Sequence, residues 1–388
     1  MNLDFNKSPL IVFWETTQAC DLACRHCRAV AMPDPHPREL TTEEGKRLID
    51  RIAEFEVAPI LIYTGGDPLK RKDIYELVAY GVEKRLRVAM SPSGTPLVTK
   101  ERLQRLRDVG LMRVSFSLDG SNRYIHDSFR GVKGSFEYTM NGIRWSREVG
   151  LTVQVNTTVT KWNYGDLENI AELLSKMEIV MWDVFFLVPT GRATLWDMIS
   201  PSQFEEAFER LYELSMKYNF TIKTTAATHY RRFQIQQMER RGINITPESV
   251  KGAYMTARKG HPHHGFTTGV TDGRGIMFIS KTGDIFPSGF LPIKTGNVRE
   301  DDLIDVYQNH PVFRSLRDPD QLKGKCGKCS FKEICGGSRA RAYGITGDYL
   351  AEEPYCIHTP EGFDFRESLA YKIERGIFPD GPAVKRAI

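Results

Sequence analysis

The sequence predicts an α/β protein in two parts, a partial (β/α)6 barrel of the TIM type followed by a smaller C-terminal α+β domain. Short β-rich runs alternate with helical runs over the first half of the chain. Each β-rich run ends in residues such as Gly, Ser, Asp or Asn, and in barrels of this type the loops after the strands carry the chemistry. The length of 388 residues also leaves room for a second, smaller domain.

Six strand and helix units account for the barrel. The strands are expected within residues 9–16, 58–68, 86–94, 112–120, 152–160 and 180–191. The helices are expected from Thr41 and within 73–85, 100–109, 136–149, 166–177 and 201–218. The first helix has a capping box, because Glu44 follows Thr41 by three residues, ahead of apolar Leu48, Ile49 and Ile52.

The chain after the sixth unit is less regular. Residues 221–242 are expected to be an extended stretch entering a helix, and residues 273–289 a hairpin. We therefore expect the barrel over 9–225, a connecting helix and mobile loop over 226–265, and the smaller domain over 266–388. The loop, from about residue 243 to 266, contains His261, His263 and His264.

Composition excludes several classes of protein. The net charge of +4 comes from interspersed basic and acidic residues, which does not favour nucleic-acid binding. No apolar run approaches the ~20 residues of a membrane span, and the N-terminus lacks the pattern of a secretory signal. We therefore expect a cytoplasmic protein with no membrane partner. Seven cysteines in that compartment, grouped as three and four, indicate two metal centres rather than disulfides.

Cys20, Cys24 and Cys27 form a C-x3-C-x2-C triplet directly after the first predicted strand. Three thiolates on one loop suit an iron–sulfur cluster in which one iron has no protein ligand and is free to bind a cofactor. The alternatives are a zinc site, which usually has four ligands with shorter paired spacings, or three packed core cysteines.

This triplet closely resembles that of the radical S-adenosylmethionine (SAM) superfamily. The resemblance implies a [4Fe–4S] cluster whose fourth iron is chelated by SAM. It also implies a reducing electron donor such as ferredoxin or flavodoxin, and cleavage of SAM to a 5′-deoxyadenosyl radical that abstracts hydrogen from a substrate. The resemblance covers nearly the whole chain, from about residue 9 to 360.

Further residues match SAM contacts of that superfamily. The run from Gly65 to Pro68 corresponds to its Gly-Gly-acid-Pro motif, which holds the SAM amino group, although an ordinary turn would give the same pattern. For Arg130 the alternative is an ion pair with Asp127, and for Asp119 we favour a turn cap. No catalytic side chain is predicted. The resemblance implies SAM contacts for Gly65, Gly66, Asp67, Pro68, Ser93, Ser117, Arg130, Asn156, Val188 and, beside the adenine, His26.

The second cysteine group is Cys326, Cys329, Cys335 and Cys356, with C-x2-C-x5-C-x20-C spacing. The spacing alone suits zinc or a [4Fe–4S] cluster equally. Beside the triplet, the run resembles the SPASM or twitch type of C-terminal domain, which implies a second [4Fe–4S] cluster. Many SPASM domains hold two auxiliary clusters, but this chain has Ser288 and Ser338 at two expected ligand positions. Because serine is a poor iron ligand, we expect one auxiliary cluster.

The runs 286–298, 338–343 and 346–356 resemble the branch that contains the enzymes of alternative haem biosynthesis and of nitrite-reductase haem synthesis. That resemblance implies a small-molecule substrate, an iron porphyrinoid whose propionate groups are modified. Two alternatives stay open: a SPASM-type enzyme that modifies a peptide, and a non-catalytic iron–sulfur electron carrier. Four arginines are candidates for holding substrate carboxylates by bidentate hydrogen bonds, namely Arg231, Arg232, Arg339 and Arg341.

Overall fold

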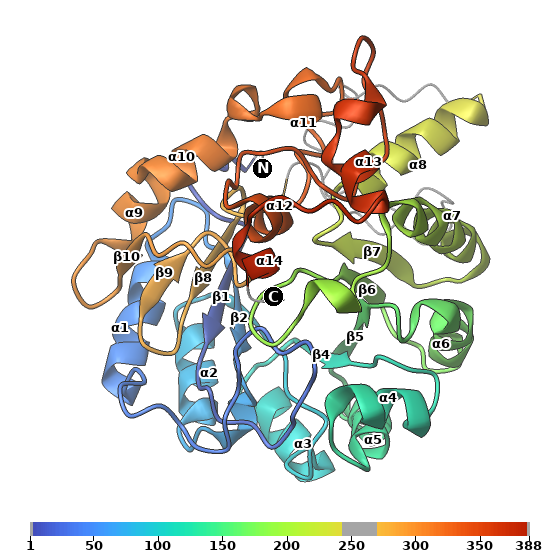
Figure 1. Cartoon of the computed structure of the whole chain (residues 1–388). Helices are drawn as coiled ribbons and strands as arrows, with labels where there is room; N and C mark the ends of the chain where they lie inside the picture. Colours follow the sequence, from blue (N-terminus) through green and yellow to red (C-terminus); the bar gives the residue numbers. More distant parts are fainter. Residues whose placement is uncertain (1–2, 243–269, 386–388) are drawn as a thin grey trace.

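The computed structural model describes residues 3–242 and 270–385 and contains one sheet of ten strands (Figure 1). The strand order is β10-β9-β8-β1-β2-β3-β4-β5-β6-β7, and every pair from β8 to β7 is parallel. The predicted fold class, α/β with a barrel-like parallel sheet, is confirmed. Helices cover the outer face of this sheet, in the arrangement typical of partial TIM barrels.

The strands and helices have the following bounds. The strands are β1 Ile11–Glu15, β2 Ile60–Thr64, β3 Arg87–Met90, β4 Arg113–Ser117, β5 Thr152–Val159, β6 Met181–Phe186, β7 Thr221–Thr225, β8 Ile276–Ile279, β9 Asp284–Phe286 and β10 Gly296–Asn297. The helices are α1 Thr42–Ala53, α2 Ile74–Glu83, α3 Lys100–Asp108, α4 Arg123–Arg130, α5 Ser135–Glu148, α6 Leu167–Ser175, α7 Pro201–Lys217, α8 His229–Arg240, α9 Leu303–Asn309, α10 Pro311–Arg317, α11 Gly324–Lys328, α12 Arg339–Thr346, α13 Leu369–Glu374 and α14 Pro382–Lys385.

The sheet extends further than six units. The stretch after α7 forms β7, a seventh parallel strand beside β6, and the hairpin predicted over 273–289 forms β8 and β9. This hairpin does not form a sheet of its own, because β8 pairs in parallel with β1, with Ile11 opposite Ile276. The domain boundaries stay predictions, and the predicted loop with His261, His263 and His264 lies outside the described residues.

The core lies between the sheet and its helices. Alternate strand residues face the helices: Trp14 packs so closely on α1 that a Cβ at Gly45 would lie 2.6 Å from its ring, and Tyr63 Oη donates to Leu77 O of α2 at 2.7 Å. The capping box of α1 is present as predicted, with Thr41 Oγ1 accepting from Glu44 N. Among the described residues, none of the helices combines the length and apolar character that crossing a bilayer requires.

Helix α4 was not predicted. Its sequence, RYIHDSFR, carries only a short apolar face, and its signal lies in its ends: Asn122 caps the first turn by accepting from Tyr124 N and Ile125 N, and Gly131 ends the helix with φ 72°. The helix places Arg130, its last residue, at the carboxyl end of β4. It therefore contributes directly to the site formed by the loops after the strands.

Candidate functional site

The loop between β1 and α1, which we call the cysteine loop (residues 16–40), carries the three N-terminal cysteines at the carboxyl end of the sheet. Cys20 and Cys24 are each 7% exposed and Cys27 is partly exposed, and none forms a disulfide. The loop is closed on itself, because Cys20 N donates to Met32 O at 2.8 Å. The structure therefore brings the predicted triplet together on one ordered loop.

Each of the three sulfur atoms receives a hydrogen bond. Leu22 N lies 3.4 Å from Cys20 Sγ, Ala31 N lies 3.4 Å from Cys27 Sγ, and Arg130 Nη1 lies 3.6 Å from Cys24 Sγ. Donors of this kind stabilise the thiolate, the form that binds metal. Burial nevertheless raises the pKa of the Cys20 and Cys24 thiols, and the Arg130 guanidinium opposes this rise at Cys24.

The loop after β2 supports the cysteine loop through its backbone. Gly66 N donates to Thr17 O at 2.8 Å, and Asp67 N donates to Ala19 O at 2.7 Å. A Cβ at Gly65 would lie 2.4 Å from Thr17 O, and Gly65 has φ 145°, so both space and conformation call for glycine there. The two glycines are needed for this contact between loops.

Asp67 points into the protein rather than toward an open site. Its carboxylate is 0% exposed and accepts from Leu69 N at 3.1 Å, Thr95 Oγ1 at 2.9 Å and Ser93 N at 3.4 Å. It caps the short 3-10 helix of Pro68–Lys70. Burial raises the pKa of Asp67 to about 6 despite these donors. The observed role of the side chain is to join the loops after β2 and β3.

Ser93, in the loop after β3, lies next to the triplet as expected. Its hydroxyl donates to Gly66 O at 2.9 Å and lies 3.5 Å from Cys20 Sγ. Ser117 is the last residue of β4 and is in register with Asn156, which lies in the middle of β5 rather than at its end as expected. Asn156 Oδ1 accepts from Gln154 Nε2 at 2.8 Å. Ser93 and Ser117 lie at the carboxyl ends of consecutive strands, on the side of the sheet where the cysteine loop begins.

Arg130 pairs with Asp119, not with Asp127. Asp119 is 0% exposed, forms an ion pair with Arg130 and accepts from Thr158 N at 2.7 Å, so the preferred interpretation of Asp119 as a turn cap was wrong. Asp127 instead accepts from Gly134 N and Phe136 N, each at 2.7 Å. A buried carboxylate needs a cation, and Arg130 is the residue that places positive charge beside both Asp119 and Cys24.

His26 and Val188 differ in their surroundings. The His26 ring stacks on Phe129 with 4.5 Å between centroids, and its buried Nδ1 has no hydrogen-bond partner in the described structure. Val188 is 3% exposed within an apolar cluster with Leu291, Leu316 and Ala340. The structure therefore places Val188 in packing against the C-terminal part of the chain rather than among the residues that touch the cysteine loop.

Sequence reasoning missed Arg192, which follows β6. Its Nε donates to Cys24 O at 2.9 Å, Nη1 lies 3.4 Å from Ala31 O, and its backbone N donates to Cys27 O at 3.0 Å. A Cβ at the preceding Gly191 would lie 2.4 Å from Cys27 O. The available signal was the Gly-Arg pair at the tip of the sixth strand, the same kind of loop position as the other site residues.

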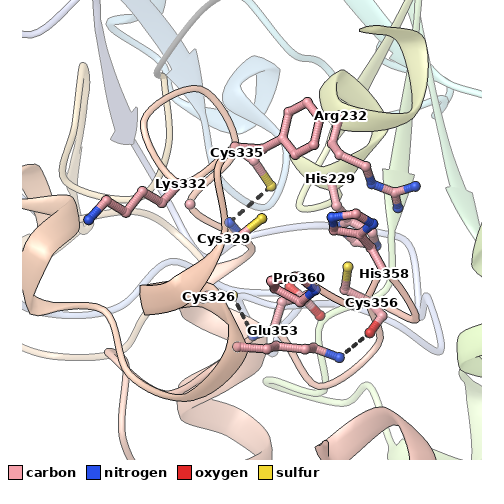
Figure 2. A pocket seen from close by; sticks show the side chains of 14 residues that line it. His229, Arg232, Cys326, Cys329, Lys332, Cys335, Glu353, Cys356, His358 and Pro360 are labelled. Carbon is pink, nitrogen blue, oxygen red and sulfur yellow. Dashed lines mark hydrogen bonds between the residues drawn. The ribbon is translucent and has the colours of Figure 1, made fainter. Parts of the chain in front are cut away.

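The four C-terminal cysteines line a pocket of about 400 Å³, a volume that includes space open to solvent (Figure 2). Cys326 belongs to α11, Cys329 and Cys335 lie in the segment between α11 and α12, and Cys356 follows α12. The other lining side chains include His229, Arg232, Lys325, Glu353 and His358. In the parts of the chain that the structure describes, no three His, Cys, Asp or Glu side chains converge closely enough to hold a single metal ion.

Backbone donors also reach the sulfur atoms of this pocket. Glu353 N lies 3.2 Å from Cys326 Sγ and Gly337 N lies 3.4 Å from Cys335 Sγ. Burial raises the pKa of Cys335 to about 12 and, against the opposing charges of Arg232 and Lys325, the pKa of Cys356 to about 11. Only binding of a metal makes thiolates favourable in such surroundings.

Ser288 and Ser338 are engaged in hydrogen bonds. Ser288 Oγ donates to Asp272, whose other carboxylate oxygen accepts from Ala340 N at 3.0 Å. Ser338 caps α12, with its hydroxyl accepting from Arg341 N at 3.2 Å. A network of protein groups therefore occupies the two positions where further cluster ligands were considered.

The expectation that four arginines hold substrate carboxylates was wrong, because each is at least 92% buried and bonded to the protein. Arg231 donates to Ile334 O and Val270 O, and Arg339 donates to Tyr349 O and Ala351 O. Arg232 pairs with Glu205, and Arg341 pairs with Glu353 at 3.1 Å. Their guanidinium groups therefore join segments of the chain through hydrogen bonds and ion pairs.

Comparison with known proteins identifies the family. Residues 14–174 match the family described as the Radical SAM superfamily. A relative from Methanosarcina barkeri, named AdoMet-dependent heme synthase, is 43% identical over 354 residues, which are 91% of this chain and 98% of the relative. The chain belongs to the radical SAM superfamily. A second radical SAM relative with the same name, from Nitratidesulfovibrio vulgaris, is 42% identical over 352 residues, which are 90% of this chain and 92% of the relative.

The fold of this radical SAM chain is shared by Streptococcus suis SuiB, whose structure was solved with S-adenosylmethionine bound. The TM-score is 0.66 at 17% identity, covering 91% of this chain and 78% of SuiB. As a radical SAM enzyme, the protein binds SAM and a [4Fe–4S] cluster. The cysteine loop fits such a cluster, because it supplies three thiols and each sulfur atom accepts a hydrogen bond. The loop also carries His26, whose buried Nδ1 has no hydrogen-bond partner in the described structure.

Proposed function

We propose that this radical SAM enzyme acts on an iron porphyrinoid and modifies its propionate side chains. The observation that carries the proposal is the similarity to proteins named AdoMet-dependent heme synthase, which extends over 91% of this chain and 98% of the Methanosarcina barkeri relative. The similarity extends well beyond the matched family region of residues 14–174, because it covers 354 residues.

In this proposal Cys20, Cys24 and Cys27 hold the cluster that binds SAM. When bound, these groups supply one-electron cleavage of SAM and hydrogen abstraction from a substrate C–H bond. The chain's own residues orient the loop: Arg130 places positive charge beside Cys24, and Arg192 holds the carbonyl groups of Cys24 and Cys27. Ser93, Ser117, Asn156 and His26 are proposed SAM contacts, and Gly65, Gly66 and Asp67 support the loop.

We further propose that the four-cysteine pocket holds a second [4Fe–4S] cluster. The four cysteines line one pocket but do not converge closely enough in the described structure to hold a single metal ion, which supports a cluster over a zinc ion with four ligands at one centre. Arg232, Lys325 and Lys332 line the same pocket, and their charges balance those of thiolates. A cluster here accepts the electron that the substrate gives up when hydrogen abstraction is followed by loss of a side-chain group.

The electrons balance for loss of carbon dioxide from a propionate. The group –CH2–CH2–COO⁻ becomes –CH=CH2 by losing one hydrogen atom, carbon dioxide and one electron, so an electron acceptor is required. Loss of the whole propionate as acrylate, with a hydrogen left on the ring carbon, is the other outcome that the proposal includes, and it needs no net electron acceptor. A separate reductant, a ferredoxin or flavodoxin, supplies the electron for SAM cleavage.

Anaerobic titration with iron-coproporphyrin tests the proposal. We expect a shift in visible absorbance on binding and, after SAM and dithionite are added, a product that is lighter in mass spectrometry by the elements of formic acid or of acrylic acid for each propionate modified. The Cys24→Ala variant is the control, since it should bind the porphyrinoid and form no product. Neither a spectral shift nor a lighter product from the reconstituted parent would reject the porphyrinoid as substrate and favour a peptide.

A further inference from the structure

We propose that His229 is a positioning residue of the four-cysteine pocket, donating its ring N–H to a sulfur atom of the bound group and raising its reduction potential. This inference rests on the proposed function, in which the pocket holds an iron–sulfur cluster. Figure 2 shows the His229 ring at the wall of the pocket on the side of Cys356 and Arg232.

The His229 ring is a buried polar group without a protein partner. It is 0% exposed, and neither ring nitrogen has a hydrogen-bond partner in the described structure. A buried donor left without an acceptor destabilises the folded protein. Such a group needs an explanation in an otherwise well-bonded site.

Packing of the carbon atoms fixes the orientation of this ring. His229 is the first residue of α8, and its ring stacks on Phe204 with 5.6 Å between centroids and an interplanar angle of 17°. The edge of the Phe208 ring lies against it, with 4.8 Å between centroids. The two phenylalanines hold the ring in one plane at the lining of the pocket, so its nitrogen atoms keep a fixed direction.

The ring is neutral and carries one N–H. Burial, with the nearby charges of Arg341 and Arg232, lowers the pKa of His229 well below its ordinary value. A neutral imidazole donates from one nitrogen and accepts at the other. The ring therefore suits a hydrogen bond to an acceptor without adding a full charge.

Sulfur is the most abundant acceptor that lines the pocket beside His229, because four of the lining residues are cysteines. The Glu353 carboxylate in the same lining is engaged by Arg341, Ser338 N and Tyr355 N. The four cysteine sulfurs, together with the sulfide of a bound cluster, are therefore the acceptors that we assign to His229, and the ring of His358 is another acceptor of this lining. Arg232 Nε is a second buried donor of this wall that has no partner in the described structure.

Hydrogen bonds to the sulfurs of a cluster affect its reduction potential. Reduction adds negative charge to the sulfurs, which strengthens the hydrogen bond and favours the reduced form. A donor at this position therefore makes the cluster a better acceptor for the electron that leaves the substrate. Three properties of His229 match this role: burial, fixed orientation and the absence of a competing partner.

The test measures the midpoint potential of this cluster alone. A full-length variant with Cys20→Ala, Cys24→Ala and Cys27→Ala removes the other cluster, and potentiometric titration followed by electron paramagnetic resonance then reports the remaining one. His229→Phe on this background should lower the midpoint potential, because an aromatic ring of similar shape replaces the donor. His229→Gln, which keeps an N–H, should have a potential between the two.

Tyr230→Phe is the matched control. Tyr230 is the next residue of α8, is 2% exposed and does not line the pocket, so the change alters a buried polar atom of the same helix without reaching the cluster. The control should have the potential of the background protein. Equal potentials for His229→Phe and the background, or an equal shift in Tyr230→Phe, would overturn the inference.

Two further measurements separate the possible failures. Metal analysis of the background protein comes first: bound zinc would overturn the auxiliary cluster of the proposed function and the inference with it, whereas iron and sulfide with unshifted potentials would overturn the inference alone. If His229→Phe fails to retain iron, the background protein labelled with ¹⁵N-histidine decides. A ¹⁵N coupling to the reduced cluster, lost in His229→Gln, supports the hydrogen bond, and its absence from the labelled protein overturns it.

Discussion

The two cysteine sites share one structural feature, a buried ion pair, and differ in how this pair reaches the sulfur atoms. Each has a buried arginine and carboxylate pair at its back: Arg130 with Asp119 beside Cys24, and Arg341 with Glu353 beside Cys326. At the first site the arginine itself reaches the sulfur atom. At the second site the backbone of the glutamate does so, while the arginine donates to the carboxylate and to the carbonyl groups of Phe186, Leu187 and Ala226.

The supporting structure differs as well. The cysteine loop is held by backbone hydrogen bonds with the loops after β2 and β6 and with α4, and by the side chains of Arg130 and Arg192. The four-cysteine pocket also has backbone donors to its sulfur atoms, but cationic side chains line it, those of Arg232, Lys325 and Lys332. In the proposed function, three thiols would leave one coordination position of a cluster free, while four thiols would complete the coordination of theirs. The number of thiols and the kind of support therefore correspond to one site with a free coordination position and one site without.

Removing ligands should have the largest effect and should separate the sites completely. Cys24→Ala should abolish formation of 5′-deoxyadenosine while leaving about four irons per chain, because the C-terminal thiols are untouched. The double change Cys326→Ala and Cys329→Ala should also leave about four irons but preserve SAM cleavage. Iron and sulfide analysis with product quantification checks both. Formation of 5′-deoxyadenosine by Cys24→Ala at the parent rate would show that the sites had been assigned wrongly.

Breaking the buried ion pairs should have the next largest effect. Arg130→Met leaves the Asp119 carboxylate buried and unpaired, which should cost about 3–5 kcal/mol of unfolding free energy. Arg341→Met should cost a similar amount because Glu353 is 1% exposed. Anaerobic urea unfolding measures both changes.

The double variant with Asp119→Leu and Arg130→Met is the control for charge burial. It should recover part of the lost stability, since no unpaired carboxylate remains. Only variants that lack Arg130 should lose iron from the N-terminal site more readily, because Arg130 alone of the two arginines donates to a cysteine sulfur. Equal iron loss in Arg341→Met would remove this distinction between the sites.

Gly66→Ala should affect the backbone support of the first site. The added Cβ would lie 2.4 Å from Ala19 O and 2.5 Å from Gln18 O, so the cysteine loop must move. We expect a loss of about 1–3 kcal/mol and weaker SAM binding in calorimetry. Gly165→Ala, where the new Cβ meets nothing within 4 Å, is the matched control and should leave both unchanged.

The smallest expected effect is a pH dependence at Asp67. Its pKa of about 6 in the folded protein lies above the ordinary value, so the folded state binds this proton more tightly and its stability falls as pH rises through the window from about 4 to 6. Lowering the pH from 7.5 to 5.5 should therefore stabilise the parent relative to Asp67→Asn by on the order of 1 kcal/mol. Urea midpoints at both pH values measure the difference, and a constant gap would contradict it.

The sequence predicted the barrel and both cysteine groups because these depend on local patterns. Strands such as β2 are short apolar runs, and the triplet is a spacing that can be recognised without tertiary structure. The partners of buried charges could not be predicted in the same way. Asp119 and Arg130 are eleven residues apart with Asp127 nearer in the chain, and only the path of α4 decides between them. Arg341 and His229 likewise gain their roles from elements that meet only in the fold.

The parallel pairing of β1 with β8 makes the folding of the enzyme dependent on a segment that is synthesised long after β1. Ile11 cannot pair with Ile276 until that residue has been synthesised. A ribosome that adds about 5–20 residues per second needs on the order of tens of seconds to reach it. Until then β1 has an unpaired edge, of the kind that invites association with other chains. The cysteine loop follows directly after β1. This strand is therefore paired on both of its edges only when β8, in the segment before the second cysteine group, has emerged.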